Sequence, residues 1–190
     1  RWRGFSGERI TDVVNIGIGG SDLGPRMAAK ALAAWQQPDI DVHFVANIDS
    51  ADIAPLLARL DPRTTLFIVA SKTFTTLETM ANAGTARNWL LAAAGETGAV
   101  ARHFVAVSTN HAATGAFGIA REYFFVFCDS ATGIYTLSLA VALPIALAVG
   151  FRHFAQLLAG ARDMDDHFLS APAGDNLPLI LALLGLWNTS

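Results

Sequence analysis

The sequence predicts an α/β fold, in which a doubly wound parallel sheet is flanked by helices and followed by an all-helical C-terminal segment. Strand-like and helix-like runs alternate over residues 1–133, and only helical patterns follow over 134–190. The strand-like runs are apolar throughout, which is typical of strands that are covered on both faces. Alternation of this kind favours right-handed crossovers between parallel strands. We expect one domain over residues 1–190, because this length can bury one sizeable core.

Five apolar runs predict the strands of this sheet. In chain order they are residues 11–18, 41–46, 64–70, 103–108 and 123–128. Helices are predicted between them over 25–35, 50–60 and 75–95, with Ser50 as the N-cap of the second and a glycine ending the third. In the helical segment, residues 170–176 ("SAPAGDN") are the clearest loop, and they join two helices rather than two domains.

Composition narrows the class of protein. Hydrophobic residues make up 53% of the chain and charged residues 15%, so either the core is large or apolar surface meets a partner. The net charge of -3 gives no electrostatic reason to expect nucleic acid as a partner. The single cysteine, Cys128, excludes an internal disulfide and a thiolate-rich zinc site, which suits the cytoplasm.

Two apolar runs resemble membrane spans but are predicted as buried helices. Residues 134–150 contain Pro144, and residues 177–187 are shorter than the roughly 20 residues that a bilayer requires. We therefore expect no membrane association. The chain lacks an initiator Met and stops after an apolar run, so we expect a fragment of a longer protein.

The first candidate site is the glycine-rich junction "GIGGSDLG", residues 17–24, between a predicted strand and a predicted helix. Such junctions bind anions at the carboxyl ends of parallel strands. A dinucleotide fingerprint would need glycine where Asp22 stands, and a nucleotide P-loop would need lysine where Pro25 stands. The loop therefore fits an anion that is not part of a nucleotide.

The second candidate site is "SKTFTT", residues 71–76, which follows the third predicted strand. Hydroxyl groups and helix amides can donate hydrogen bonds to phosphate oxygens, and the helix dipole favours negative charge. Lys72 would add a positive charge. Serine and threonine also cap helices, but four hydroxyl groups in six positions are more than one cap requires. This junction predicts a phosphate site.

The other polar clusters give weaker evidence of a functional site. Asp163, Asp166 and His167 lie near one helix face, where a solvated surface explains them better than a metal site. His43 and His103 fall in predicted strands and are expected to be satisfied core or edge residues. No metal site and no cofactor are expected.

These motifs resemble the glucose-6-phosphate isomerase (phosphoglucose isomerase) family. "GIGGSDLGP" and "SKTFTT" are highly specific to that family, and the similarity extends over nearly the whole chain, including "HFVAVSTN" and "NLPLILALLGLWN". The resemblance implies a pair of sugar-isomerase (SIS) domains, of which this chain is the first, with the start of the helical region that follows. It also implies a homodimer that interconverts glucose 6-phosphate and fructose 6-phosphate in glycolysis and gluconeogenesis, without a cofactor.

The resemblance also implies which residues hold the phosphate of the hexose 6-phosphate. By motif, they are Gly20, Ser21, Ser71, Lys72, Thr73 and Thr76. The family's general base, its ring-opening histidine and a C-terminal lysine would lie beyond residue 190. We therefore expect this chain alone to bind the substrate and to be inactive as an isomerase, which is an intramolecular oxidoreductase.

Two residues depart from the family pattern. Ile134 stands where the family has an arginine that stabilises the enediolate, and Leu77 stands where many members have glutamine. Two alternative functions remain open at this point. One is a non-catalytic module that senses a sugar phosphate, and the other is a degenerate isomerase that has kept the fold and lost the chemistry.

Overall fold

The computed structural model describes residues 2–126 and 139–189. Ile134, which carries the main departure from the family pattern, lies outside the described residues, as does Cys128. The chain divides into two compact units, Arg1–Gly150 and Phe151–Ser190. The first unit holds the whole sheet.

The sheet has five parallel strands in the order β2-β1-β3-β4-β5. They are β1 (Asp12–Ile16), β2 (Asp41–Val45), β3 (Thr65–Ala70), β4 (Phe104–Ser108) and β5 (Phe124–Val126). In the register of the sheet, Val14 of β1 lies between His43 of β2 and Phe67 of β3. The predicted fold class is confirmed, and the strand order reverses between β1 and β3.

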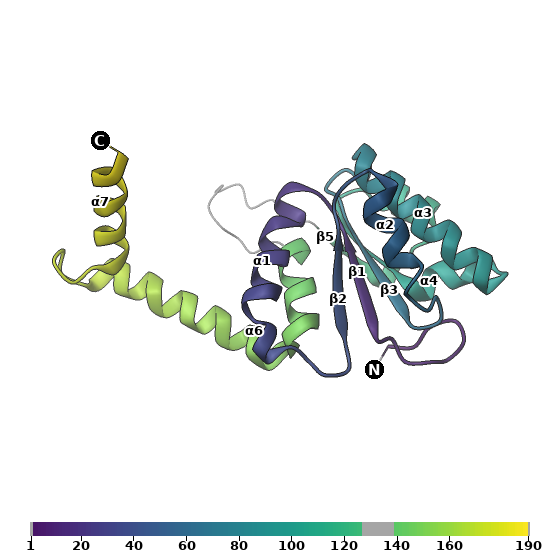
Figure 1. Cartoon of the computed structure of the whole chain (residues 1–190), viewed down its shortest axis with the longest axis horizontal. Coiled ribbons are helices and arrows are strands. Elements are labelled where there is room, and N and C mark those ends of the chain that lie inside the picture. Colours follow the sequence, from purple (N-terminus) through teal and green to yellow (C-terminus); the bar gives the residue numbers. More distant parts are fainter. Residues whose placement is uncertain (1, 127–138, 190) are drawn as a thin grey trace. The chain divides into compact units, whose positions relative to one another are not determined.

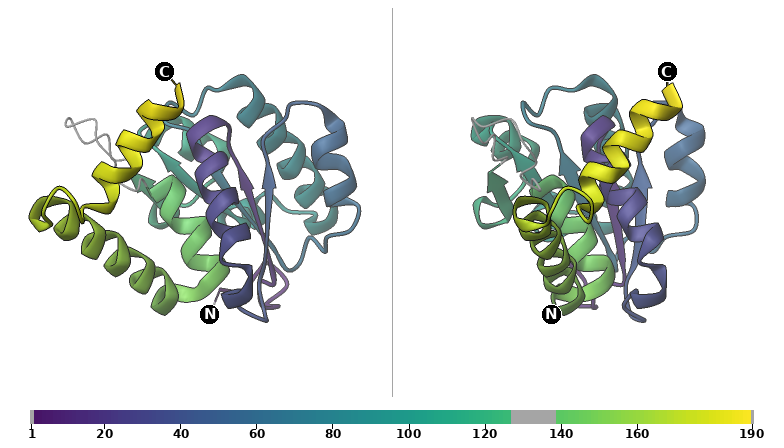
Figure 2. Two further views of the ribbon diagram at one scale, coloured as in Figure 1. Left: turned by 60° about the vertical axis from the view of Figure 1, so that its left-hand side comes forward. Right: turned by 90° about the vertical axis from the view of Figure 1, so that its left-hand side faces the viewer.

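Helices cover both faces of this sheet. The helices of the described residues, in chain order across both units, are α1 (Leu23–Ala31), α2 (Ser50–Leu57), α3 (Leu77–Ala94), α4 (Val100–His103), α5 (His111–Phe117), α6 (Leu139–Ser170) and α7 (Leu177–Thr189). Short 3-10 turns occur at Gly19–Ser21, Ala33–Trp35, Thr97–Ala99 and Arg121–Tyr123. Within the first unit, α1 and the first part of α6 lie on one face, and α2 and α3 lie on the other (Figures 1 and 2).

Two apolar clusters form the core, one on each face of the sheet. On the α2 and α3 face, Phe67 and Phe104 stack with ring centroids 4.8 Å apart and belong to a cluster with Leu90 of α3. On the other face, Val13 and Ile68 belong to a cluster against which side chains of α6 pack. All six residues of β3 are buried, which explains why its sequence is a continuous apolar run.

Three details differ from the sequence prediction. The N-cap of α2 is Asp49, whose carboxylate accepts from the backbone N–H of Ala51 at 2.9 Å, and not Ser50, which is the first helical residue. His103 is the last residue of α4 and does not lie in a strand. The short helix α5 was not predicted, because seven residues are too few to show a helical period.

The second unit consists of the later part of α6, a loop at 171–176 and α7; the loop was predicted over 170–176, and Ser170 is instead the last residue of α6. Gly150 interrupts the helical backbone of α6 at φ +80°. Asn176 is buried and its side-chain amide donates to the Phe168 carbonyl at 2.8 Å. Nε2 of His167 accepts from the backbone N–H of Leu177 at 3.2 Å. Across the described ranges, no group of three acidic, histidine or cysteine side chains is placed to hold a metal ion.

One described segment, Val141–Ser170, is long and apolar enough to cross a membrane, with a mean hydropathy of 1.5. Its first part is a core helix of the first unit, in which Ile145, Ala148 and Val149 are buried. A buried helix of a globular protein has this composition. For the second apolar run the expectation of a buried helix is wrong: residues 177–187 form a helix, but α7 has no buried residue.

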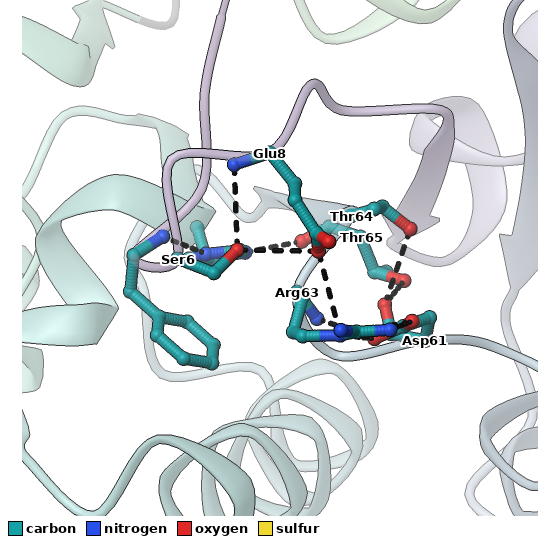
Figure 3. Close-up of polar contacts among 8 residues, drawn as sticks. Ser6, Glu8, Asp61, Arg63, Thr64 and Thr65 are labelled. Atoms are coloured by element: carbon teal, nitrogen blue, oxygen red, sulfur yellow. Dashed lines mark hydrogen bonds and ion pairs between the residues drawn. The ribbon is translucent and has the colours of Figure 1, made fainter.

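Polar contacts attach the N-terminal segment to the start of β3, at the amino edge of the sheet. Arg63 lies between the carboxylates of Asp61 and Glu8, with closest N–O distances of 2.6 and 3.4 Å (Figure 3). The hydrogen bond from the Arg63 guanidinium lowers the pKa of Asp61. The hydroxyl of Thr65 donates to the Asp61 carbonyl at 2.7 Å. Thr65 is buried, but the charged groups are partly or fully exposed, so their ion pairs orient the segment more than they stabilise it.

His103 makes the buried connection at the same edge. Its Nδ1 donates to the Thr65 carbonyl at 2.6 Å, and its Nε2 accepts from the backbone N–H of Phe5 at 2.8 Å. Both bonds together require the neutral imidazole with its proton on Nδ1. The prediction of a satisfied core histidine is confirmed, and burial lowers the pKa of His103 below 6.5.

The stability of the protein should therefore fall as the pH falls through the range below 6.5. Above pH 6.5, His103 is neutral in both the folded and the unfolded chain and contributes no pH dependence. Below that pH the unfolded chain binds a proton that the folded chain resists, until the pH reaches the lowered folded pKa. Urea unfolding of the wild-type protein and of His103→Gln should be measured between pH 7.5 and 5. As the pH falls, the free energy of unfolding should decrease more steeply for the wild type than for the variant. Parallel curves for the two proteins would contradict this role.

Candidate phosphate site at the carboxyl edge of the sheet

The loop after β1 turns within two residues of the end of the strand. A Cβ at Gly17 would lie 2.8 Å from the Cβ of Ser21 and 3.2 Å from the Ala70 carbonyl oxygen. Gly19 has φ +57°, in the left-handed region. The loop is therefore packed closely enough that Gly17 cannot carry a side chain without displacing its neighbours.

Asn15 holds this loop from inside the sheet. It is the polar residue among the four buried positions of β1 and is itself fully buried. Its side-chain amide donates to the Ser21 carbonyl at 2.9 Å. On the next residue, Asp22 forms an ion pair with Arg26 at 2.8 Å, one turn along α1. These two contacts orient the backbone on both sides of the Ser21 hydroxyl.

The loop after β3 gathers its hydroxyl groups at the start of α3. The Oγ of Ser71 and the Oγ1 of Thr76 are 3.1 Å apart, and those of Thr73 and Thr75 are 2.6 Å apart. Ser71 is buried, whereas Lys72 and Thr73 are exposed. Four hydroxyl groups and one lysine thus lie within one short turn.

None of these hydroxyl groups caps α3. Thr76 occupies the N-cap position with extended backbone, but its side chain makes no capping hydrogen bond. The first backbone N–H groups of an α-helix have no partner inside the helix, so they attract an anion when no side chain satisfies them. This finding weakens the interpretation of the motif as helix capping.

The two loops meet because their strands are neighbours. β1 pairs with β3, and the order of the strands reverses between them, which is the position where open parallel sheets bind ligands. Ser21 and the carbonyl of Ala70 both lie within 3.2 Å of the position that a Gly17 Cβ would take. The structure therefore places Ser21 beside the start of the second loop. Gly20 is exposed nearby, with open space around it.

A hollow of about 590 Å³ opens at the same edge. It is lined by residues that follow β1 and β2 and by the first turns of α1, α2 and α3: Ile18, Arg26, Ala46, Asn47, Ile48, Asp52 and Glu78. Its Asp52 carboxylate accepts from the backbone N–H groups of Ala46 and Asn47 at 3.0 and 2.9 Å. Those bonds fix the turn after β2.

Sequence reasoning selected the hydroxyl-bearing residues but missed the residues that hold them. Phe74 has φ +56°, the left-handed region that L-residues other than glycine seldom adopt, and its side chain is buried. Residues 108–110, at the end of β4 and directly after it, bond to the second loop. The available signal was the motif "HFVAVSTN", whose last three residues are polar at a strand end.

The fold and this edge define an open parallel α/β domain. Its candidate anion site lies at the switch point, the position between β1 and β3 where the strand order reverses. The model of the phosphoglucose isomerase family matches residues 1–190, and the chain belongs to that family. The resemblance stated from the motifs is thereby confirmed.

Relatives and solved structures agree with this assignment. A glucose-6-phosphate isomerase of Dechloromonas aromatica is 69% identical over 189 residues, which are 100% of this chain and 36% of that protein. Glucose-6-phosphate isomerase 1 of Chromohalobacter salexigens is 53% identical over 98% of this chain and 34% of its own length. The crystal structure of a glucose-6-phosphate isomerase from Chlamydia trachomatis matches with a TM-score of 0.80 and 34% identity, over 94% of this chain and 34% of that one. The chain spans about a third of the length of these relatives.

The close approach at Gly17 predicts a difference between two glycines of the same loop. Gly17→Ala should lower the free energy of unfolding by about 1–3 kcal/mol, because the new Cβ would overlap Ser21. Gly20→Ala should change it by no more than about 0.5 kcal/mol, because nothing lies within 4 Å of that Cβ position. Denaturant unfolding of the two variants measures the difference, and equal effects would contradict the packing described here.

Proposed function

We propose that this chain is the sugar-phosphate-binding part of a glucose-6-phosphate isomerase, which interconverts glucose 6-phosphate and fructose 6-phosphate. The observation that carries the proposal is the N-terminus of α3, where the N-cap residue Thr76 makes no capping hydrogen bond and four paired hydroxyl groups lie on residues 71–76, directly before the helix. The family membership supports the identity of the substrate, because curated relatives are glucose-6-phosphate isomerases.

Each group has a distinct role in the proposed site. The hydroxyls of Ser71, Thr73 and Thr76 donate hydrogen bonds to phosphate oxygens, and the α3 dipole stabilises their negative charge. Lys72 adds a positive charge to the same loop. Gly20 and Ser21 approach from the loop after β1, where Ser21 donates a further hydrogen bond. Such contacts hold the substrate by its non-reacting end, which orients the reacting carbons.

Isomerisation through a cis-enediol requires a base that moves a proton between C1 and C2, and acid–base assistance to open the sugar ring. Glu78 follows the phosphate loop and does not match the family's base motif. We therefore assign the base, the ring-opening histidine and the C-terminal lysine to the remainder of a longer protein. The chain alone should bind sugar phosphate without converting it.

Apolar side chains in the second unit support the proposed partners. Leu181, Leu184, Leu186 and Trp187 of α7 are all more than half exposed. Exposed apolar groups on this scale mark surfaces that meet other protein. We assign them to a second SIS domain and to a homodimer, in a cytoplasmic enzyme of glycolysis and gluconeogenesis.

One observation favours a second candidate function, a degenerate isomerase that binds the substrate without turnover. Ile134 replaces the arginine that the family pattern places there. A guanidinium group can stabilise the negative charge of an enediolate, and an aliphatic side chain cannot. The two candidates share the phosphate site and differ in their chemistry.

The binding proposal predicts that 6-phosphogluconate stabilises the purified chain. At a concentration about ten times Kd, a ligand that binds only the folded state adds about 1.4 kcal/mol of stability, which raises Tm by a few degrees. Ser71→Ala and Thr76→Val should each weaken binding about tenfold, because each removes a charge-assisted hydrogen bond. Calorimetric titration measures the affinities. Ser6→Ala, at the opposite edge of the sheet, serves as the control and should bind like the wild type.

Two results would contradict this assignment. If millimolar 6-phosphogluconate did not stabilise the chain, the proposed phosphate site would be wrong. If the purified 190-residue chain converted fructose 6-phosphate, the proposal that the base lies in the remainder of a longer protein would be wrong.

The role of Ile134 is tested by reversion in the longer protein. If the degenerate candidate is correct, Ile134→Arg should raise kcat by about two orders of magnitude or more, because it restores charge stabilisation in the transition state. Ile134→Lys is the matched control and should restore less, since an ammonium group lacks the planar fork of donors. Full activity in the unaltered longer protein, unchanged by either substitution, would show that the arginine is dispensable there.

A further inference from the structure

The carbonyl oxygen of Lys72 accepts three hydrogen bonds from Ser108, the last residue of β4, and from Thr109, which follows it. The backbone N–H of Thr109 donates at 2.8 Å, the Thr109 hydroxyl at 2.8 Å and the Ser108 hydroxyl at 2.9 Å. Ser108 is fully buried. Three donors on one carbonyl fix both the position and the direction of that peptide group.

The next carbonyl of the loop is held by the next residue of the same segment. Nδ2 of Asn110 donates to the Thr73 carbonyl at 3.0 Å, while its Oδ1 accepts from the N–H of Ala113 at 3.1 Å and so caps α5. The backbone N–H of Asn110 donates to the Ser108 hydroxyl at 3.2 Å. Asn110 therefore joins the loop to the start of a helix.

The loop needs such support because its backbone is strained. Phe74 has φ +56°, a conformation that costs an L-residue free energy unless the surroundings enforce it. The buried Phe74 ring packs edge-on against Phe117, with centroids 5.7 Å apart, which holds the side chain but not the preceding peptide groups. The contacts from residues 108–110 hold those groups.

The direction of the two carbonyls matters for an anion. Carbonyl oxygens repel phosphate oxygens, whereas N–H and hydroxyl groups attract them. With the Lys72 and Thr73 carbonyls bonded toward the end of β4, the loop is free to present donors to a ligand. Rotation of either peptide group would turn an acceptor toward the phosphate.

We infer that Ser108, Thr109 and Asn110 are positioning residues for the phosphate loop, which set its carbonyls away from the ligand without touching the ligand themselves. This inference rests on the proposed function, because it concerns how the same loop recognises phosphate. It assigns a ligand-related role to a strand end that lies one strand further from the switch point.

The test uses substitutions that remove one donor and preserve the rest. Thr109→Val removes a hydroxyl from an exposed side chain of similar shape, and Asn110→Ser keeps a side chain that caps α5 but loses the Nδ2 donor. Each should raise the Kd for 6-phosphogluconate about fivefold, the effect of one lost hydrogen bond. Thr109→Ser retains the hydroxyl and should keep wild-type affinity.

A control variant separates positioning from general stability. Thr85→Val removes a hydroxyl that bonds to the Ala81 carbonyl at 3.0 Å on the surface of α3. It should leave Kd unchanged, with a shift in Tm similar to that of Thr109→Val. The ¹³C and ¹⁵N chemical shifts of residues 72–76 should move in Thr109→Val and not in Thr85→Val.

The outcomes distinguish this inference from the proposed function. Unchanged affinity in both Thr109→Val and Asn110→Ser, in a chain that binds 6-phosphogluconate, would overturn the positioning role alone. A loss of affinity that Thr109→Ser does not rescue would also overturn it. Absence of binding by the unaltered chain would overturn the proposed function together with this inference.

Discussion

The pairing of β1 with β3 is the constraint on which the rest of the molecule depends. The two strands are separated in sequence by α1, β2 and α2, yet they lie side by side, and β3 is buried throughout. Apolar side chains on both faces make this pairing favourable, since each face has its own cluster of buried residues. Because parallel strands end at the same edge, the pairing brings a glycine loop and a hydroxyl loop together. A change that loosened this pair would separate the halves of the candidate site before it altered any residue within it.

Buried polar side chains fix the loops at this edge of the sheet in particular positions. Asn15 and Ser108 are the polar residues that β1 and β4 carry into the interior, and each bonds to a backbone carbonyl of a site loop. A buried polar group costs stability unless it is hydrogen-bonded, so such residues tolerate few arrangements of the loops around them. At the opposite edge, His103 plays a comparable part for the N-terminal segment. The interior thus contains apolar groups for stability and a few polar groups for position.

Much of the fold and part of the site could be predicted from the sequence. Continuous apolar runs marked the strands, and the spacing of hydroxyl groups marked residues 71–76, because these signals are local. The N-cap of α2 was assigned to Ser50 instead of Asp49, since adjacent residues can both cap and only backbone geometry decides between them. The left-handed Phe74 and the bonds from residues 108–110 could not be predicted, because contacts between separate strands leave no periodic pattern. The departures at Ile134 and Leu77 were visible only against the family pattern.

The missing cap on α3 has a consequence for the helix itself. Thr76 stands at the cap position of this 18-residue helix, but its hydroxyl bonds to that of Ser71 and makes no capping hydrogen bond. A phosphate bound there would become the cap, and the ligand would complete a structural element that the chain leaves open. By linkage, whatever free energy the ligand gains from the helix, the helix gains from the ligand. Fraying of the first turn of α3 and binding of the phosphate would then be coupled, so that the helix N-terminus becomes more ordered as the site fills.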